Sequence, residues 1–92
     1  MIRSFADRDT EMLFDRDVSR RWQMIARVAL RRLRLLHRAT TLNDLRSPPG
    51  NRLEALKGDR TGQYCIRVND QYRICFRWDR GDAYEVELID YH

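Results

Sequence analysis

The sequence predicts an α+β fold in which two helices near the N-terminus cover one face of a small, mostly antiparallel sheet. Apolar residues recur at steps of three and four between residues 20 and 38, and they alternate with polar residues from residue 63 onward. Two helices that precede an antiparallel meander can cover only one of its faces well. We therefore expect the order strand, helix, helix, and then three or four strands.

The size and composition exclude several classes of protein. With 92 residues and 11.1 kDa, the chain is expected to form one domain, residues 1–92. The mean hydropathy is −0.72, and no run approaches the roughly 20 apolar residues that a membrane span needs. Asp7 interrupts the N-terminal apolar residues too early for a signal peptide. We expect a cytoplasmic protein with reduced thiols and, given two distant histidines and no zinc spacing, no metal and no cofactor.

The first half of the chain predicts a strand and two helices. Residues 1–5 alternate in polarity and are typical of a short strand, and Asp7 or Asp9 can cap a short helix that ends at residues 17–19. Ser19 is the candidate cap of a long helix over residues 20–38. Its arginines lie mostly off the apolar stripe and are expected to be solvated, with contact to a partner or to RNA as the less favoured alternative. The stripe comprises Trp22, Ile25, Ala26, Ala29, Leu30, Leu33 and Leu36.

The second half predicts a meander. Prolines and a glycine at 48–50 stop any helix, and a polar loop at 57–62 precedes strands at 63–68, 72–78 and 84–88. The face expected under the helices carries Tyr64, Ile66, Val68, Tyr72, Ile74, Phe76, Trp78, Tyr84, Val86 and Leu88. The opposite, polar face is expected to carry Cys65, Arg67, Arg73, Cys75, Arg77, Glu85 and Glu87.

The turn at residues 69–71 fixes the expected register of the first hairpin. It sets Val68 opposite Tyr72 and Arg67 opposite Arg73, and it brings the two cysteines together as small hydrophobic residues rather than as a disulfide. Like charges directly opposite each other destabilise a sheet. Either an anion lies between the two arginines, or the glutamates of the last strand neutralise them. We expect the polar face to be concave or open and to lie beside Lys57 and the C-terminal residues.

The charge points to a polyanionic partner. Eighteen basic and 14 acidic residues give a net charge of +4 and a pI near 9.6, which favours nucleic acid, although a merely basic soluble surface is the alternative. The only lysine, Lys57, suggests a site that requires a compact ammonium group. The chain ends in Asp90, Tyr91 and His92, which are suited to proton transfer directly after a strand, unless this end is simply frayed.

Several motifs together resemble one known family. They are MI-x-SF at residues 1–5, LRSPPGNRLEAL at 45–56, GDR-x-G at 58–62, IRVNDQYRICF at 66–76 and DYH at 90–92. Over essentially its whole length the chain resembles the HigB toxins of bacterial type II toxin–antitoxin systems, within the RelE/ParE superfamily. The resemblance implies a RelE-like toxin fold and a ribosome-dependent endoribonuclease that cuts mRNA in the ribosomal A site. It also implies inhibition by a HigA-type helix-turn-helix antitoxin, through which operator DNA is contacted only indirectly, and no membrane partner.

The resemblance also implies a set of site residues. The catalytic positions correspond to Lys57, Arg73, Asp90, Tyr91 and His92. Asp90 and His92 would act as acid and base, without separate assignment, Lys57 and Arg73 would stabilise phosphate charge, and Tyr91 would orient or stack on a base. Further arginines expected to bind RNA phosphates are Arg60, Arg67 and Arg77. Some family members carry histidine where this chain has Glu54, which is a departure from the pattern.

Two other functions are alternatives. One is a ParE-like toxin that binds DNA gyrase and has no nuclease activity, but that class lacks the terminal acid–base cluster. The other is a basic RNA-binding or ribosome-binding module without catalysis. Ribosome profiling would detect cuts at translated positions, and plasmid supercoiling would detect an effect on gyrase.

Overall fold

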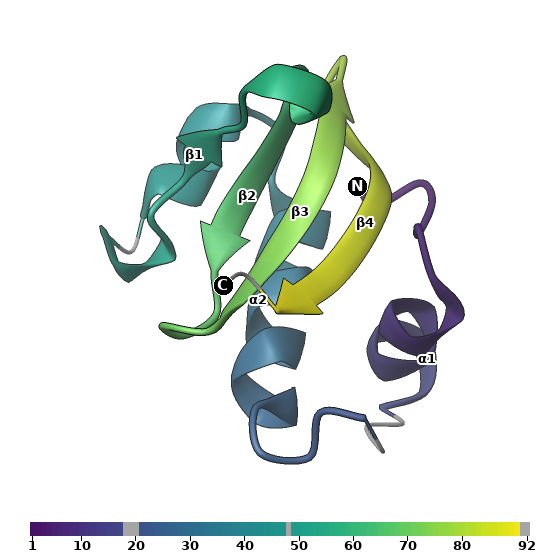
Figure 1. The fold of residues 1–92 in the computed structure, drawn as a ribbon. Coiled ribbons are helices and arrows are strands. Elements are labelled where there is room, and N and C mark those ends of the chain that lie inside the picture. Colours follow the sequence, from purple (N-terminus) through teal and green to yellow (C-terminus); the bar gives the residue numbers. More distant parts are fainter. Residues whose placement is uncertain (18–20, 48, 91–92) are drawn as a thin grey trace.

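The computed structural model describes residues 1–17, 21–47 and 49–90. Helices α1 (Arg8–Arg16) and α2 (Ala26–Arg38) precede a four-stranded antiparallel sheet with the spatial order β1, β2, β3, β4. The strands are β1 (Glu54–Ala55), β2 (Gln63–Arg67), β3 (Tyr72–Asp79) and β4 (Asp82–Asp90), with 3-10 turns η1 (Leu42–Arg46), η2 (Pro49–Asn51) and η3 (Gly58–Arg60). Figure 1 shows α2 behind the sheet. The predicted α+β architecture is confirmed, and neither described helix is long and apolar enough to cross a membrane.

Helix α1 begins at one of the two caps that the sequence offered. The carboxylate of Asp7 accepts a hydrogen bond from the backbone N–H of Thr10 at 2.7 Å, which satisfies one of the free donors at the start of the helix. The helix ends at Arg16, and Asp17 adopts a left-handed conformation with a φ of 55°. This conformation closes the last turn and redirects the chain. The other two residues of the predicted breaker lie outside the described residues.

Helix α2 begins later than predicted. The apolar period indicated a helix from residue 20, but residues 21–25 form turns and the helix starts at Ala26. Trp22 is nevertheless buried. The turns reverse the chain after α1 and still bring this indole into the core, so the spacing alone did not distinguish them from helix. Ser19, the predicted cap, lies outside the described residues, and Ile25 at the observed N-cap makes no side-chain capping bond.

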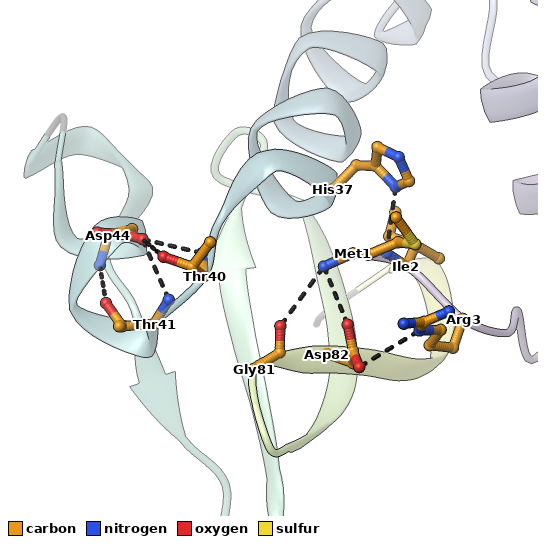
Figure 2. Close-up of polar contacts among 9 residues, drawn as sticks. All are labelled: Met1, Ile2, Arg3, His37, Thr40, Thr41, Asp44, Gly81 and Asp82. Carbon is orange, nitrogen blue, oxygen red and sulfur yellow. Dashed lines mark hydrogen bonds and ion pairs between the residues drawn. The ribbon is translucent and has the colours of Figure 1, made fainter.

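The N-terminal segment pairs with the free edge of β4, but not as a continuous strand. Two isolated parallel bridges join Ile2 to Ala83 and Phe5 to Val86. Figure 2 shows how the first residues are held: the amino group of Met1 lies 3.4 Å from the Asp82 carboxylate. The backbone N–H of Ile2 donates to Nδ1 of His37 at 3.1 Å, so this histidine has a structural role at the end of α2.

The first hairpin has the predicted register. Arg67 is opposite Arg73, Cys65 is opposite Cys75, and the N–H of Val68 donates to the carbonyl of Tyr72 at 3.0 Å. In the second hairpin, Arg80 and Gly81 both have positive φ, as a two-residue type I′ turn requires. A Cβ on Gly81 would also lie 3.1 Å from a backbone oxygen of η1's flanking loop, so two requirements favour glycine there.

A β-bulge in β4 changes which side chains share a face. Trp78 pairs with Ala83 and Arg77 with Tyr84, whereas Cys75 pairs with Glu87, so β4 carries one extra residue between these pairs. Glu85 lies at the bulge with a φ of 53°. The prediction that Tyr84 faces the helices is therefore wrong. Strict alternation was assumed along the strand, and the inserted residue reverses the parity, so that Ala83 takes the core position.

The core lies between the helices and the covered face of the sheet. Its buried members come from the N-terminal segment, both helices and the residues that flank α2, η1, and the last three strands with the β2–β3 turn. They are Ile2, Leu13, Trp22, Ala29, Leu33, Leu36, Ala39, Leu45, Ile66, Val68, Ile74, Phe76, Ala83, Val86 and Leu88. Since α1 and α2 both contribute to this one cluster, the other face of the sheet is left without a helix over it.

Candidate functional site

The face of the sheet turned away from α2 is the candidate site, and we call it the polar face. Its cross-strand rows are Arg67 with Arg73, Cys65 with Cys75 and Glu87, and Arg77 with Tyr84. It is turned toward the viewer in Figure 1, where the η3 segment arches over one end of it. The predicted set of basic side chains on a face free of helices is therefore present, with Tyr84 added by the bulge.

Arg60 reaches from η3 across the polar face to β4. Its guanidinium donates to Oε1 of Gln63 at 3.1 Å and to Oε1 of Glu87 at 3.2 Å. Because one side chain contacts both β2 and β4, it spans β3, and the two cysteines in the row of Glu87 are fully buried. Arg60, one of the arginines expected from the sequence to bind phosphates, thus lies over the polar face with one carboxylate already bound.

The glutamates of β4 do not pair with the opposed arginines. Neutralisation of Arg67 and Arg73 by these glutamates was one of the two alternatives that the sequence left open, but Glu87 pairs with Arg60 and Glu85 lies 3.6 Å from Arg77. Arg67 instead pairs with Asp70 in the hairpin turn. The physical reason is proximity: a turn residue three positions away needs no reach across the sheet, whereas Glu87 lies one row further along the face and Glu85, at the bulge, lies near Arg77.

The opposed arginines are gathered at the β2–β3 turn. Arg73 donates to the backbone carbonyls of Asn69 and Tyr72, which orients its guanidinium at this end of the polar face. The turn itself is ordered by the side chain of Asn69, which accepts from the N–H groups of Gln71 and Tyr72 at 2.8 and 2.7 Å. Two cations held this close form a local positive potential that favours a phosphate.

The end of β4 lies beside these arginines. Ile89 pairs with Arg73 and Asp90 pairs with Tyr72, so the chain arrives at residue 90 next to the Arg73 row. The Asp90 carboxylate accepts a hydrogen bond from Nε2 of Gln71 at 3.0 Å. Two of the five predicted catalytic residues, Arg73 and Asp90, thus lie at the same end of the sheet, but in consecutive rows whose side chains alternate between its faces. Asp90 shares the row of Tyr72, which packs against the core, whereas Arg73 belongs to the polar face. Tyr91 and His92 lie outside the described residues.

Lys57 lies at the other end of the sheet. It is exposed and follows Leu56, whose N–H donates to the carbonyl of Gln63 at 2.9 Å, and Gln63 is level with Arg77 on β3. Asp90 is level with Tyr72. Five residues of β3 separate these levels, which corresponds to about 17 Å along the strand. Asp90, the last described residue, therefore does not lie beside Lys57, contrary to our expectation for the end of the chain.

A pocket of about 590 Å³ opens at the Lys57 end of the polar face. Its lining residues are Ser4, Gly62, Arg77, Trp78, Asp79, Tyr84 and Glu85. A phenol beside a guanidinium is a combination that can stack on a base and contact a phosphate. Sequence reasoning missed Tyr84 as a site residue because the bulge carries no composition signal: the residue with positive φ is a glutamate rather than a glycine.

The two buried thiols interact with each other. The hydrogen bond that Cys75 donates lowers the pKa of Cys65, and the same bond together with burial raises the pKa of Cys75. Both thiols are free of a disulfide and fully buried, so they offer no accessible nucleophile in this state. Within residues 1–17, 21–47 and 49–90, no group of three His, Cys, Asp or Glu residues is arranged to hold a metal ion.

Comparison with known proteins shows which family the chain resembles. A family model described as the RelE-like toxin of the type II toxin–antitoxin system HigB matches residues 3–92. The chain is 39% identical to Toxin HigB-1 of Vibrio cholerae serotype O1 over 90 residues, which cover 96% of this chain and 95% of that one. It is 35% identical over 94 residues to Endoribonuclease HigB of Proteus vulgaris, which covers 100% of both chains.

A solved structure supports the fold independently. The YoeB/ParE toxin from Agrobacterium tumefaciens matches with a TM-score of 0.58 and 15% identity, covering 99% of this chain and 98% of that one. At this identity the similarity concerns the fold alone. The family model and the two relatives, in contrast, cover nearly the whole chain, and a toxin of a type II system has an antitoxin as its partner. The chain belongs to the HigB family of RelE-like toxins from type II toxin–antitoxin systems.

Proposed function

We propose that this toxin is an endoribonuclease that cuts mRNA on the ribosome, in the A site, and thereby stops translation and growth. The observation that carries the proposal is the end-to-end match to a relative named Endoribonuclease HigB, in a chain that ends in an acid, a phenol and an imidazole. Its location would be the cytoplasm, where ribosomes are. A HigA-type antitoxin would hold it inactive and contact operator DNA on its behalf.

The chemistry follows from the residue types that the family resemblance assigns. A base removes the proton of the ribose 2′-OH, the 2′ oxygen attacks the phosphorus, and an acid protonates the departing 5′ oxygen. Asp90 and His92 would supply these two proton transfers. The reaction as written needs no metal, because side chains carry every proton and cations stabilise the added negative charge.

Phosphate stabilisation falls to the cations of the polar face. Arg73 lies at the end of the polar face that β4 reaches at Asp90, and its guanidinium would bind the phosphate at the reacting centre there. Arg67, opposite Arg73, would contact the same phosphate, Arg77 would bind one further along the face, and Arg60 would join them by exchanging Glu87 for a phosphate. Lys57 would contact the RNA nearer the pocket, and Tyr91 would stack on a base. This arrangement predicts that the mRNA runs along the strands.

The test is to remove the last two residues. Deleting Tyr91 and His92 should leave the free energy of unfolding within about 1 kcal/mol of the full chain, because the core of the described residues is complete at Leu88. Cleavage of mRNA on programmed ribosomes should fall by about 10²- to 10⁴-fold, the usual cost of losing a general acid or base. Lys57→Ala should weaken cleavage less. Gln23→Ala, exposed on the helix side, is the matched surface control.

Three outcomes would contradict the proposal. A folded truncated toxin that cuts at the full rate would mean that the terminal residues are not catalytic. Cleavage of naked mRNA as efficient as cleavage on ribosomes would remove the ribosome from the mechanism. Loss of plasmid supercoiling with no mRNA cuts would place the protein among the gyrase-binding toxins instead.

A further inference from the structure

Helix α2 carries a row of arginines on the side opposite its buried stripe. Arg27, Arg31, Arg34 and Arg38 are all exposed and follow one another at steps of four, three and four residues. At 3.6 residues per turn they fall within an arc of about 60° and extend over roughly 16 Å of helix. We call them the arginine stripe. The residues that bury α2 in the core, such as Leu33 and Leu36, lie on the other side of the helix.

The charge of the stripe is not compensated locally. Helix α2 contains no acidic residue, and none of the four guanidinium groups lies within 4.0 Å of a carboxylate of the described residues. Asp17, at the end of α1, lines a shallow hollow of about 350 Å³ with Arg27, Arg31 and Arg34, and is the one carboxylate bordering the stripe among the pockets described. Four cations near one carboxylate leave a strongly positive strip.

The neighbourhood of the stripe adds to this potential. A second hollow of about 380 Å³ is lined by Arg31, Arg32, Arg34, Leu35 and Arg38. Burial, together with the positive charge of Arg31, lowers the pKa of Arg32, whose Nε–H donates to the carbonyl of Arg67 at 3.3 Å. The helix therefore tolerates closely spaced cations that disfavour one another. Such an arrangement stabilises the free protein little and is relieved when an anion binds.

The composition of the stripe indicates what kind of anion fits. Protein interfaces are built around aromatic or aliphatic anchors, whereas in the described residues the exposed large hydrophobic side chains are Met1 and Met24, neither on the stripe. Planar guanidinium groups that bind two oxygens at once match phosphates. We propose that the arginine stripe binds the phosphate backbone of structured RNA, as a second RNA surface on the opposite side of the molecule from the polar face.

The proposal deepens the proposed function and rests on it for the choice of RNA over DNA. If the polar face holds the mRNA, a cation row on the far side contacts the ribosomal RNA around it. The two surfaces have different tasks: the polar face contains the reacting groups, and the stripe fixes the toxin's position without sequence preference.

The experiment compares two fourfold variants of the full-length toxin. One is Arg27→Gln, Arg31→Gln, Arg34→Gln and Arg38→Gln. The control is Arg8→Gln, Arg16→Gln, Arg46→Gln and Arg80→Gln, which changes the net charge equally at exposed arginines that likewise have no ion pair with a described carboxylate. Glutamine has nearly the helix propensity of arginine, so both variants should fold, which thermal unfolding checks.

The measured quantity is binding of a 20-base-pair RNA hairpin by fluorescence anisotropy across salt concentrations. The stripe variant should bind on the order of 10- to 100-fold more weakly than the wild type. The slope of log K against the logarithm of the salt concentration should become less steep by roughly three to four in the stripe variant and by less than about one in the control. Equal losses in both variants would overturn the proposal, as would tighter wild-type binding to a DNA duplex of the same length. The proposal would also be overturned if the stripe variant no longer bound co-expressed antitoxin but bound RNA as the wild type does, since the stripe would then be a protein interface.

Hairpin binding needs no catalysis, so the outcome is separate from that of the truncation. If the toxin proves unable to cut mRNA, stripe-dependent RNA binding still supports the stripe. If it cuts mRNA on ribosomes and the stripe variant binds RNA as the control does, the stripe is rejected and the nuclease is retained.

Discussion

The hydroxyl of Thr10 is a small group on which the position of β4 depends. Thr10 is fully buried on α1, and its Oγ1 accepts a hydrogen bond from the backbone N–H of Leu88 at 3.0 Å while donating to Asp7 at 3.0 Å. The N-terminal segment pairs with β4 only as far as Val86. Beyond that bridge, the Thr10 side chain rather than a neighbouring strand accepts the backbone hydrogen bond of β4, two residues before Asp90.

The structure sets the size of the effect of Thr10→Val. Valine keeps the shape of threonine but cannot accept a hydrogen bond, so the N–H of Leu88 stays buried without this partner. An unsatisfied buried donor costs 1–3 kcal/mol, and we expect about 2 kcal/mol here. For a domain of this size that is a large part of the total stability and lowers the melting temperature by about 10 °C.

Urea unfolding followed by tryptophan fluorescence measures this loss. The matched control is Thr40→Val, because the Thr40 hydroxyl also bonds to a carboxylate, at 3.2 Å, but is exposed; its cost should be about 0.5 kcal/mol or less. Hydrogen exchange should show faster exchange of the Leu88 amide in Thr10→Val alone. If the two variants unfold within about 0.5 kcal/mol of each other, the hydroxyl does not hold β4 and the reasoning is refuted.

Three further predictions concern polar groups. Asn51→Ala should cost about 2 kcal/mol in urea unfolding, because this buried amide donates to two backbone carbonyls; an unchanged midpoint would contradict this. Hydrogen bonds from the backbone N–H groups of Thr40 and Thr41 and from the Thr40 hydroxyl, drawn in Figure 2, hold the pKa of Asp44 below its usual value. Its contribution is therefore present above the unfolded pKa of about 3.9 and lost as pH falls through the folded value. The stabilities of wild type and Asp44→Asn should differ at pH 6 and converge in strong acid, and a constant difference would argue against this. Glu87→Gln should free Arg60 and raise RNA affinity up to about fivefold at low salt, measured by anisotropy; weaker binding would contradict it.

Much of the fold follows from periodicity in the sequence. The step of two after residue 63 predicted the hairpin register correctly, down to the opposed Arg67 and Arg73, because alternation and the length of a turn leave few ways to pair two strands. The helix cap at Asp7 was also among the predicted ones, because a carboxylate just before an apolar run can accept hydrogen bonds from the free N–H groups of the first helical turn.

The rest depended on information that a single periodic pattern does not contain. The bulge that turns Tyr84 to the polar face has a glutamate, Glu85, at its positive-φ position, so no glycine signals it. The start of α2 was misplaced because turns bury Trp22 as well as a helix would. The possible pairing of the β4 glutamates with Arg67 and Arg73 was inferred from the cross-strand rows alone. Arg60 is not part of those rows: it approaches from the η3 segment and forms an ion pair with Glu87.

The pairing of Arg60 with Glu87 bears on how the polar face can bind RNA. Both side chains are partly exposed, with 42% and 24% of their surfaces accessible, so water screens the pair and it contributes at most about 1 kcal/mol. A phosphate offers the same guanidinium a bidentate partner of higher charge. Exchange of the carboxylate for a phosphate therefore costs little, and the displaced Glu87 remains in the row beside Arg73. The free toxin thus keeps Arg60, Arg67 and Arg77 ordered by weak internal ion pairs that the proposed RNA ligand would replace, and these pairs reduce the mutual repulsion of the arginines on one small sheet.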